Sequence, residues 1–202
     1  DKLNNLNREA ILIIDCAYMD YAYNDPKKYF ENFNHINDNV LVLLAYSCSK
    51  SFSYYGYRLG ALIAINNDAE FVRKFQNLAS RVARSVWTSV SNLAMTNLAG
   101  VLTEHFDEYV KERNEAVQSL KKRTDLFISQ AKECGLELYP YTEGFFVTVK
   151  TDVDEETRNV IHKRLMDNHI YTIAVTRGLR VGLCSTPLAK VDGLAKRIKD
   201  LI

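Results

Sequence analysis

The sequence lacks the patterns that mark several large classes of protein. Its four cysteines and four histidines show no CxxC or HExxH spacing, so we expect neither a disulfide framework nor a metal site. No apolar run approaches the roughly 20 residues that a membrane-spanning helix needs. We also expect no signal peptide. The simplest setting for such a chain is the reducing cytoplasm, without a membrane partner.

An excess of charge of either sign is also missing. The chain has 26 basic and 25 acidic residues, which gives a formal net charge of +1. A short basic run at 121–123 is interpreted as part of a helix surface. This balance provides no electrostatic reason to expect nucleic acid or an anionic membrane as a partner.

Apolar residues are abundant and are arranged in short runs. They make up 47% of the 202 residues, enough to bury a sizeable core. The runs at 11–16 and 40–46 are nearly continuous, which is typical of strands buried on both faces of a parallel sheet. A third run at 59–65 follows too closely for a helical crossover, so part of the sheet is expected to be antiparallel.

Helical patterns come next, and capping residues predict where they begin and end. Asp68 is expected to cap a helix over about 68–85, and one long helix is expected over roughly 89–134, stopped by Gly135. The sequence then predicts strands at 144–150, 170–175 and 179–184, a helix at 154–168 opened by Asp154, and a last helix with Thr186 as N-cap and Pro187 in its first turn.

This order of elements predicts an α/β chain in two parts. Residues 1–115 would form a mainly α/β section and residues 116–202 a smaller α+β section, joined by the long helix. The chain begins at Asp1 without an initiator Met and enters a regular pattern almost at once. We therefore expect it to be a piece of a longer protein.

The informative cluster of reactive side chains follows the second apolar run. Lys50 lies just past the expected strand, Arg58 follows eight positions later, and serine hydroxyls surround both. A lysine forms an imine with an aldehyde. An arginine offers a planar bidentate fork to a phosphate, and hydroxyls add hydrogen bonds. The segment 47–60 therefore predicts a site for a phosphorylated aldehyde.

The pattern SxSKxxxxxGxRxG in this segment resembles the cofactor-lysine signature of class I and II aminotransferases, which are fold-type I pyridoxal-phosphate (PLP) enzymes. The resemblance implies that Lys50 binds PLP covalently and later moves a proton between Cα and the cofactor. It implies that Ser47 and Arg58 bind the phosphate, with Ser49 as a weaker candidate. It also implies an α/β fold: the C-terminal half of the PLP-dependent transferase large domain, mostly parallel sheet with helices, followed by a small α+β C-terminal domain.

A second motif resembles the same family. The sequence DCAY at 15–18 resembles the family's D-x-A-Y motif and lies 35 positions before Lys50. By this resemblance Asp15 is a buried carboxylate that keeps the pyridine nitrogen protonated, so that the ring acts as an electron sink. Tyr18 would donate a hydrogen bond to the phenolic oxygen of the ring.

A third match lies near the C-terminus. Residues 179–185 resemble the strand whose arginine binds the α-carboxylate of the substrate. Arg180 fits that role, since an amino acid needs a bidentate partner for its carboxylate. Arg177 is the second choice.

Two further matches concern substrate choice. Arg84 lies 26 residues after Arg58, where the aspartate aminotransferase branch has an arginine that reaches across a dimer to the substrate's side-chain carboxylate. The neighbouring residues 85–88 depart from that branch. Residues 144–146 resemble a G-x-F segment of the small domain, where an aromatic ring can approach the substrate.

Together these matches imply an aminotransferase that moves the amino group of aspartate, glutamate or an aromatic amino acid to a 2-oxo acid. The full-length protein is expected to be a homodimer. The resemblance does not cover the family's N-terminal half, so the chain alone is expected to be inactive. Two alternatives stay open: a PLP-dependent lyase or synthase of the same fold, and a transcription regulator that uses an aminotransferase-like domain as a ligand sensor.

Overall fold

The fold is taken from a computed structural model, which describes residues 2–202 apart from the side chains of residues 26 and 27. The chain divides into two compact units, Asp1–Arg113 and Asn114–Ile202. The assignment of residues 1–115 and 116–202 to two domains of a PLP-dependent transferase stays a prediction.

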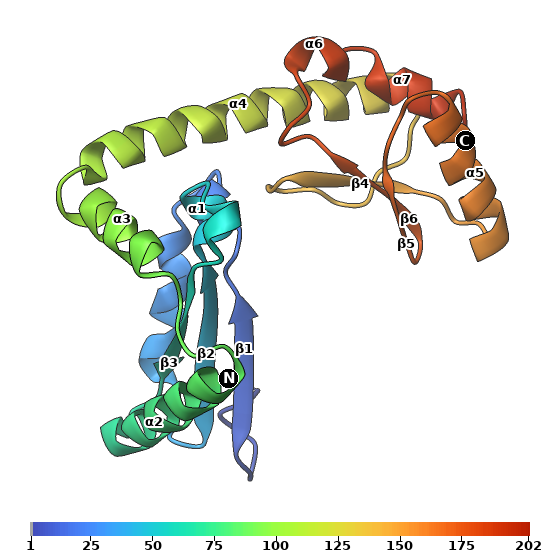
Figure 1. The fold of residues 1–202 in the computed structure, drawn as a ribbon. Coiled ribbons are helices and arrows are strands. Elements are labelled where there is room, and N and C mark those ends of the chain that lie inside the picture. The colour runs from blue at the N-terminus through green and yellow to red at the C-terminus, as the bar shows by residue number, and fades with distance from the viewer. Residues whose placement is uncertain (1) are drawn as a thin grey trace. The chain divides into compact units, whose positions relative to one another are not determined.

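The first unit is built on a three-stranded sheet (Figure 1). Its strands are β1 (Ala10–Asp15), β2 (Val40–Ser47) and β3 (Gly60–Ile65), in the order β1-β2-β3. β1 runs parallel to β2, and β3 runs antiparallel to it, which confirms the predicted mixture of directions. The middle strand β2 is buried from Val40 to Leu44, because a neighbour on each side and apolar side chains on its faces exclude water.

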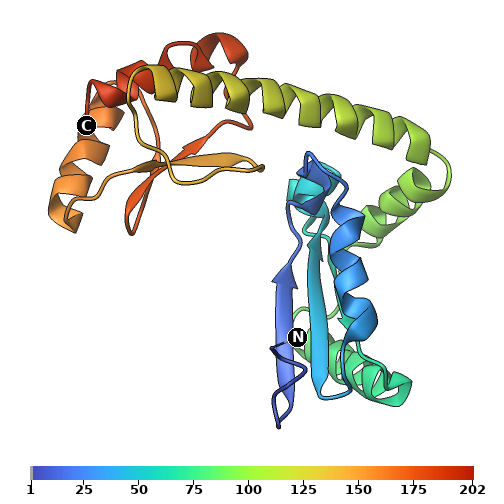
Figure 2. The ribbon, with the colours of Figure 1, turned by 180° about the vertical axis from the view of Figure 1, so that it is seen from behind.

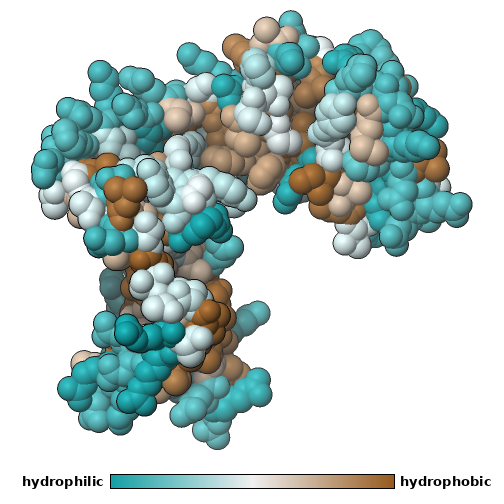
Figure 3. Space-filling model, viewed as in Figure 1, coloured by the Kyte–Doolittle hydropathy of each residue, from teal (hydrophilic) through white to brown (hydrophobic). Residues whose placement is uncertain are grey.

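The expectation that β1 is buried on both faces is wrong. Ile11 and Ile13 are 64% and 66% exposed, whereas the alternate residues Leu12 and Ile14 pack against the core of β2. β1 is an edge strand, and nothing among residues 2–202 covers its second face. Figure 3 accordingly shows hydrophobic residues at the surface over this sheet.

Short helical segments connect the strands of the first unit. The 3-10 helix η2 (Pro26–His35) lies beside the sheet, as Figure 2 shows from behind, and its Phe30 and Phe33 pack against the buried core of β2. The other segments are η1 (Met19–Tyr21), α1 (Cys48–Ser51) and η3 (Tyr55–Tyr57). The first follows β1, and the other two lie between β2 and β3.

The helix after β3 begins where the sequence predicts. α2 (Ala69–Val86) has Asp68 as N-cap, whose carboxylate accepts the backbone N–H groups of Glu70 and Phe71 at 2.8 and 3.1 Å. None of its residues is buried among the described part of the chain. Its apolar side chains, such as Leu78 at 61% exposure, therefore remain at the surface.

The expected single helix over 89–134 is wrong, because two helices occupy this stretch. They are α3 (Asn92–Thr103) and α4 (Phe106–Glu133), separated at Glu104 and His105. The N–H of Glu104 still bonds to a carbonyl of α3, and the carbonyl of His105 already accepts an N–H of α4. Neither glycine nor proline occurs at this break, so the sequence contains no helix-breaking residue that would have predicted it.

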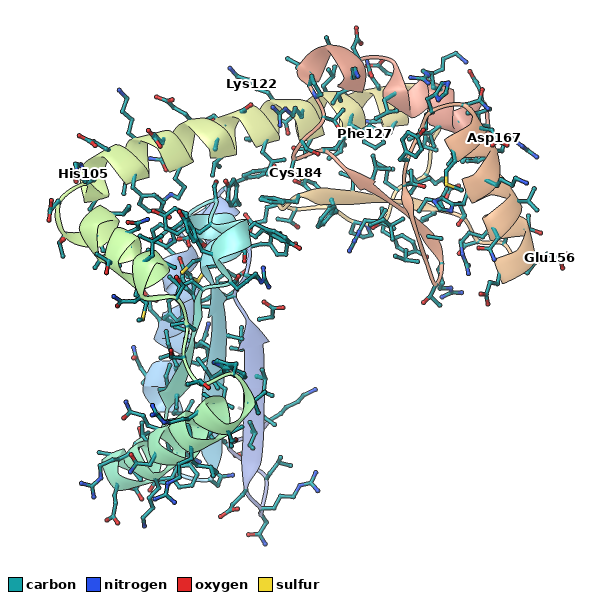
Figure 4. The ribbon with its side chains drawn as sticks, viewed as in Figure 1. His105, Lys122, Phe127, Glu156, Asp167 and Cys184 are labelled. Atoms are coloured by element: carbon teal, nitrogen blue, oxygen red, sulfur yellow. The ribbon has the colours of Figure 1, made fainter. Side chains whose placement is uncertain are left out.

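The second unit packs helices on a small antiparallel sheet of order β4-β6-β5. Its strands are β4 (Phe146–Lys150), β5 (Ile173–Val175) and β6 (Gly178–Gly182). Its helices are α5 (Glu155–Asp167), α6 (Leu188–Val191) and α7 (Leu194–Lys199), with the C-terminal part of α4. Phe127, drawn in Figure 4, is fully buried on α4, as are Leu165 on α5 and Ile198 on α7. No described helix combines the length and apolar character needed to cross a lipid bilayer.

Two of the three predicted helix boundaries in this unit are confirmed. Gly135 follows the end of α4 with a left-handed φ of 69°, and Asp154 caps α5 by accepting the N–H of Thr157 at 2.8 Å. Thr186 as N-cap is wrong. Its hydroxyl donates to the Gly182 carbonyl at 3.0 Å instead, and Pro187 takes the N-cap position without a side-chain bond.

Candidate active site

Polar residues of the first unit lie at one edge of its sheet, namely the edge where β1 and β2 end and β3 begins. β1 and β2 are parallel and end together, since Asp15 pairs with Ala45 two residues before Ser47. β3 is antiparallel and begins at this edge, where Gly60 pairs with Ser47. The edge thereby collects the predicted cofactor residues Asp15, Tyr18, Ser47, Ser49, Lys50 and Arg58.

Local hydrogen bonds fix the short helix that carries Lys50. Ser47 is its N-cap, and the Ser47 Oγ accepts the N–H of Ser49 at 3.3 Å. The N–H of Cys48 donates to the Leu59 carbonyl at 3.0 Å, which ties the helix to the start of β3. Lys50 is therefore presented from a defined backbone at the end of the buried strand.

The Lys50 amine lies between two phenol rings. Its Nζ is 4.2 Å from the ring centroid of Tyr55 and 5.9 Å from that of Tyr18. Within residues 2–202 no carboxylate forms an ion pair with it. Tyr55 lies in a variable position of the cofactor-lysine pattern, so that pattern does not single it out.

Arg58 converges on the same group. Its Nη1 donates to the Tyr55 carbonyl at 2.9 Å and, more weakly, to the Ser49 Oγ at 3.5 Å. Its φ of 54° is left-handed, a strained conformation for a side chain that is not glycine. The guanidinium lies 5.2 Å from the Tyr55 ring centroid. Lys50 and Arg58 thus share one aromatic ring, with the Ser49 hydroxyl beside Arg58.

The exposure of Asp15 differs from the prediction. The sequence reading expects a buried carboxylate, but Asp15 is exposed because it ends the edge strand whose second face is uncovered. Its Oδ1 accepts the N–H of Ala17 at 3.0 Å, which turns the chain toward Tyr18. Tyr18 itself is 39% exposed and precedes η1.

Steric constraints require glycine at one of the two glycine positions in the pattern. A Cβ on Gly60 would lie 2.5 Å from the carbonyl oxygen of Tyr46, so only glycine allows β2 and β3 to pair this closely. A Cβ on Gly56 would meet nothing within 4 Å. Gly60 therefore permits the close approach of β2 and β3 at the start of the strand that follows Arg58.

Arg180 occupies the middle strand of the sheet in the second unit. It pairs with Thr148 on β4 and Ile173 on β5, and its guanidinium lies 4.3 Å from the ring centroid of Phe146. Its Nε is buried and has no hydrogen-bond partner among the described residues. A buried guanidinium N–H without a partner favours an anionic ligand. Arg177 lies exposed between β5 and β6.

Arg84 is not brought to the Lys50 group within the first unit. It lies exposed in the last turn of α2. In both ribbon views α2 lies toward the end of the sheet opposite α1 (Figures 1 and 2). No cluster of three or more histidine, cysteine, aspartate or glutamate side chains able to hold a metal occurs in the part of the chain that the structure describes.

Comparisons with known proteins show what the chain is similar to. A family model described as aminotransferase class I and II matches residues 1–198. No curated protein is significantly similar to the chain in sequence. Among solved structures, an aminotransferase from Anaerococcus prevotii is 32% identical, with a TM-score of 0.90 over 98% of this chain and 48% of that chain.

Two other solved structures share the fold at lower identity. An aromatic-amino-acid aminotransferase from Burkholderia pseudomallei, covalently bound to pyridoxal phosphate, is 18% identical, with a TM-score of 0.73 over 99% of this chain and 58% of that chain. The aspartate aminotransferase of Thermus thermophilus with maleate is 18% identical, with a TM-score of 0.71 over 95% and 48%.

These matches confirm the predicted fold class, an α/β fold of the PLP-dependent transferases. The chain spans about half the length of the structures it matches. Since the family model matches nearly all of its residues, the chain belongs to the class I and II aminotransferase family.

Proposed function

We propose that this chain is part of an enzyme that transfers the amino group of an L-amino acid to a 2-oxo acid, with PLP as cofactor. The observation that carries the proposal is the group at the sheet edge, where Lys50 and Arg58 lie over the ring of Tyr55 and Arg58 also contacts the Ser49 hydroxyl. We further propose that the full-length protein is a homodimer.

The donor set fits the chemical groups of PLP. The Lys50 amine has no acidic partner among residues 2–202 and suits an aldehyde. Arg58 and the hydroxyls of Ser47 and Ser49 suit a phosphate. Asp15 at the end of β1 offers a carboxylate to a pyridine nitrogen. The covalently bound PLP in the related Burkholderia pseudomallei structure supports this assignment.

Each residue then has a defined task. When bound, PLP supplies an electron sink for the negative charge that develops at the substrate Cα. The Lys50 amine would remove the Cα proton as a general base and deliver it to the former aldehyde carbon of the cofactor. Arg58, Ser47 and Ser49 retain the phosphate throughout the cycle. Asp15 keeps a proton on the ring nitrogen, and Tyr18 donates to the phenolic oxygen.

Substrate recognition is assigned to arginines. Arg180 would bind the α-carboxylate, because its buried Nε lacks a partner and its position in β6 is fixed by strands on both sides. Arg84 would bind the side-chain carboxylate of a dicarboxylic substrate in the dimer. Aspartate and glutamate are therefore proposed substrates. Aromatic amino acids are proposed as well, and both choices are in line with the aspartate and aromatic enzymes among the similar structures.

The test is a half-reaction of the full-length protein loaded with PLP. We expect aspartate, glutamate or an aromatic amino acid alone to yield one 2-oxo acid per site, with further turnover only after a second 2-oxo acid is added. The Lys50→Ala variant should yield none, whereas Lys74→Ala, which removes an exposed lysine of α2, should match the wild type. Release of pyruvate or ammonia without an acceptor would instead indicate a lyase, and binding without any product a ligand sensor.

A further inference from the structure

A polar network that the proposed function does not use joins η1, β2 and α4. The Tyr46 hydroxyl donates to the Asp20 Oδ2 at 2.6 Å, a short charge-assisted bond. The Arg113 Nη1 lies 3.7 Å from the Asp20 Oδ1. The Asp20 and Arg113 side chains are only 15% and 25% exposed, so this carboxylate is held between a phenol and a guanidinium with little water around it.

The network joins the two segments that carry Tyr18 and Lys50. Asp20 lies in η1, two residues after Tyr18. Tyr46 is the residue of β2 before the N-cap Ser47, four positions before Lys50. The bond between Asp20 and Tyr46 therefore joins residues 26 positions apart in the sequence. It connects the segment that carries Tyr18 to the segment that carries Lys50, whose amine lies 5.9 Å from the centroid of the Tyr18 ring.

The beginning of α4 holds the other end of the Lys50 helix. The Tyr109 hydroxyl donates to the Ser51 carbonyl at 3.2 Å, and the Tyr109 ring stacks on Phe52 with centroids 4.5 Å apart. Arg113 lies one turn further along α4, with its guanidinium 5.6 Å from the Tyr109 ring centroid. Arg113 thus connects this second anchor to Asp20.

The network keeps its hydroxyl protons at neutral pH. Burial and the hydrogen bond to Asp20 raise the pKa of Tyr46 above its ordinary value. Burial and the charge of Asp20 raise the pKa of Tyr109 to about 12. Both phenols therefore remain donors, and the bonds that hold α1 persist over the pH range in which the enzyme would work.

We infer that Asp20 is a positioning residue, which fixes Lys50 relative to Tyr18 through Tyr46 and Arg113. Asp20 acts without touching substrate or cofactor. The inference rests on the proposed functions of Lys50 and Tyr18.

The test compares Asp20→Ala, Tyr46→Phe and the double variant in the full-length, PLP-loaded enzyme. Tyr139→Phe is the matched control, because its hydroxyl donates to the Arg177 carbonyl at 3.3 Å in the second unit. The measurements are kcat, KM, the visible circular dichroism band of the bound cofactor, the rate at which cofactor-free protein takes up PLP, and thermal unfolding.

We expect each single variant to lower kcat about tenfold while KM stays within about twofold, as for a lost hydrogen bond that positions the reacting group. The circular dichroism band should change, and PLP uptake should slow. The double variant should be no worse than either single one, since both break the same contact. Asp20→Asn retains an acceptor for Tyr46 and should restore most of the band. Tyr139→Phe should behave as the wild type.

An unchanged band and kcat in folded Tyr46→Phe, or an effect on thermal unfolding alone, would overturn the inference. Tyr46→Phe removes a single oxygen, so it decides the question even where Asp20→Ala does not fold. Failure of the proposed function has a different signature, namely turnover and a normal cofactor band in Lys50→Ala.

Discussion

At the scale of single residues, Lys50 and Arg180 share an environment that is uncommon for cations. Each faces an aromatic ring, Tyr55 for Lys50 and Phe146 for Arg180. Neither forms an ion pair with an acidic side chain in the described part of the chain. A ring attracts a cation without satisfying its hydrogen-bond donors. Both groups therefore keep donors available for a ligand.

Arg180→Gln in the full-length enzyme should raise the KM for the amino acid about 10- to 100-fold, because a hydrogen bond to a charged group contributes about 1.5–3 kcal/mol. The packing on Phe146 would largely remain, so the fold should persist. Steady-state kinetics measure the effect. Arg177→Gln is the control, because Arg177 is exposed between two strands. A large KM effect in the control alone would transfer the role to Arg177.

Contacts between residues that are close in sequence follow from the local pattern. Ser47, Ser49 and Arg58 lie within one short segment and are joined by hydrogen bonds, whereas their roles toward a cofactor stay predictions. The bond between Asp20 and Tyr46 spans 26 residues and depends on how η1 packs, which no local pattern encodes. The burial of Asp15 is mispredicted for a related reason, because burial depends on what covers the strand rather than on the strand itself.

At the scale of elements, the pairing of β2 and β3 depends on a close approach at Gly60. Gly60→Ala should destabilise the full-length protein by about 1–3 kcal/mol, the usual cost of overpacking, because the added Cβ would lie 2.5 Å from the Tyr46 carbonyl oxygen. Turnover should fall as well, since Arg58 precedes this strand. Gly56→Ala should be neutral in thermal unfolding, because a Cβ there meets nothing within 4 Å. Equal effects of the two substitutions would contradict this account.

The N-cap of α5 predicts a pH dependence of stability. Hydrogen bonds from Thr157 lower the pKa of Asp154 in the folded state. The stabilisation that Asp154 provides is therefore present above the pKa of an unfolded aspartate, about 4, and is lost as the pH falls below it. Asp154→Ala should unfold at lower temperature than the wild type at neutral pH, with a difference that shrinks in acid. Asp152→Ala, a nearby exposed aspartate, is the control. A difference that grows in acid would refute the assignment.

Element boundaries are predictable where a side chain or glycine terminates the helix locally. Asp68, Gly135 and Asp154 each do so, and each was identified from sequence. The break at Glu104 contains no such residue, and Thr186 is drawn away from its predicted capping role by the Gly182 carbonyl. Competition between possible hydrogen bonds is settled by the fold and not by the local sequence.

At the scale of the whole molecule, the 202 residues alone are predicted to be inactive. The chain spans about half the length of the structures it matches, and Ile11 and Ile13 expose apolar surface beside Asp15. An exposed Asp15 lacks the low-dielectric surroundings that would strengthen its interaction with a ring nitrogen. The measurement is 2-oxo acid formation by a protein of these residues with added PLP. Activity above that of its Lys50→Ala variant would refute the prediction.

The fold class of the whole chain could be inferred because motifs, strand order and spacing agree over nearly its full length. The exposure of one face of the sheet could not be inferred, because the apolar run at 11–16 has the same sequence whether or not a further segment covers that face.

The central claim is that Lys50 is the residue that holds the cofactor. Borohydride reduction of the PLP-loaded, full-length protein, followed by peptide mapping, tests it most directly. We predict one pyridoxyl group per chain, attached to the Nζ of Lys50, and none in the Lys50→Ala variant. Attachment to any other lysine, or labelling that persists in Lys50→Ala, would contradict the account.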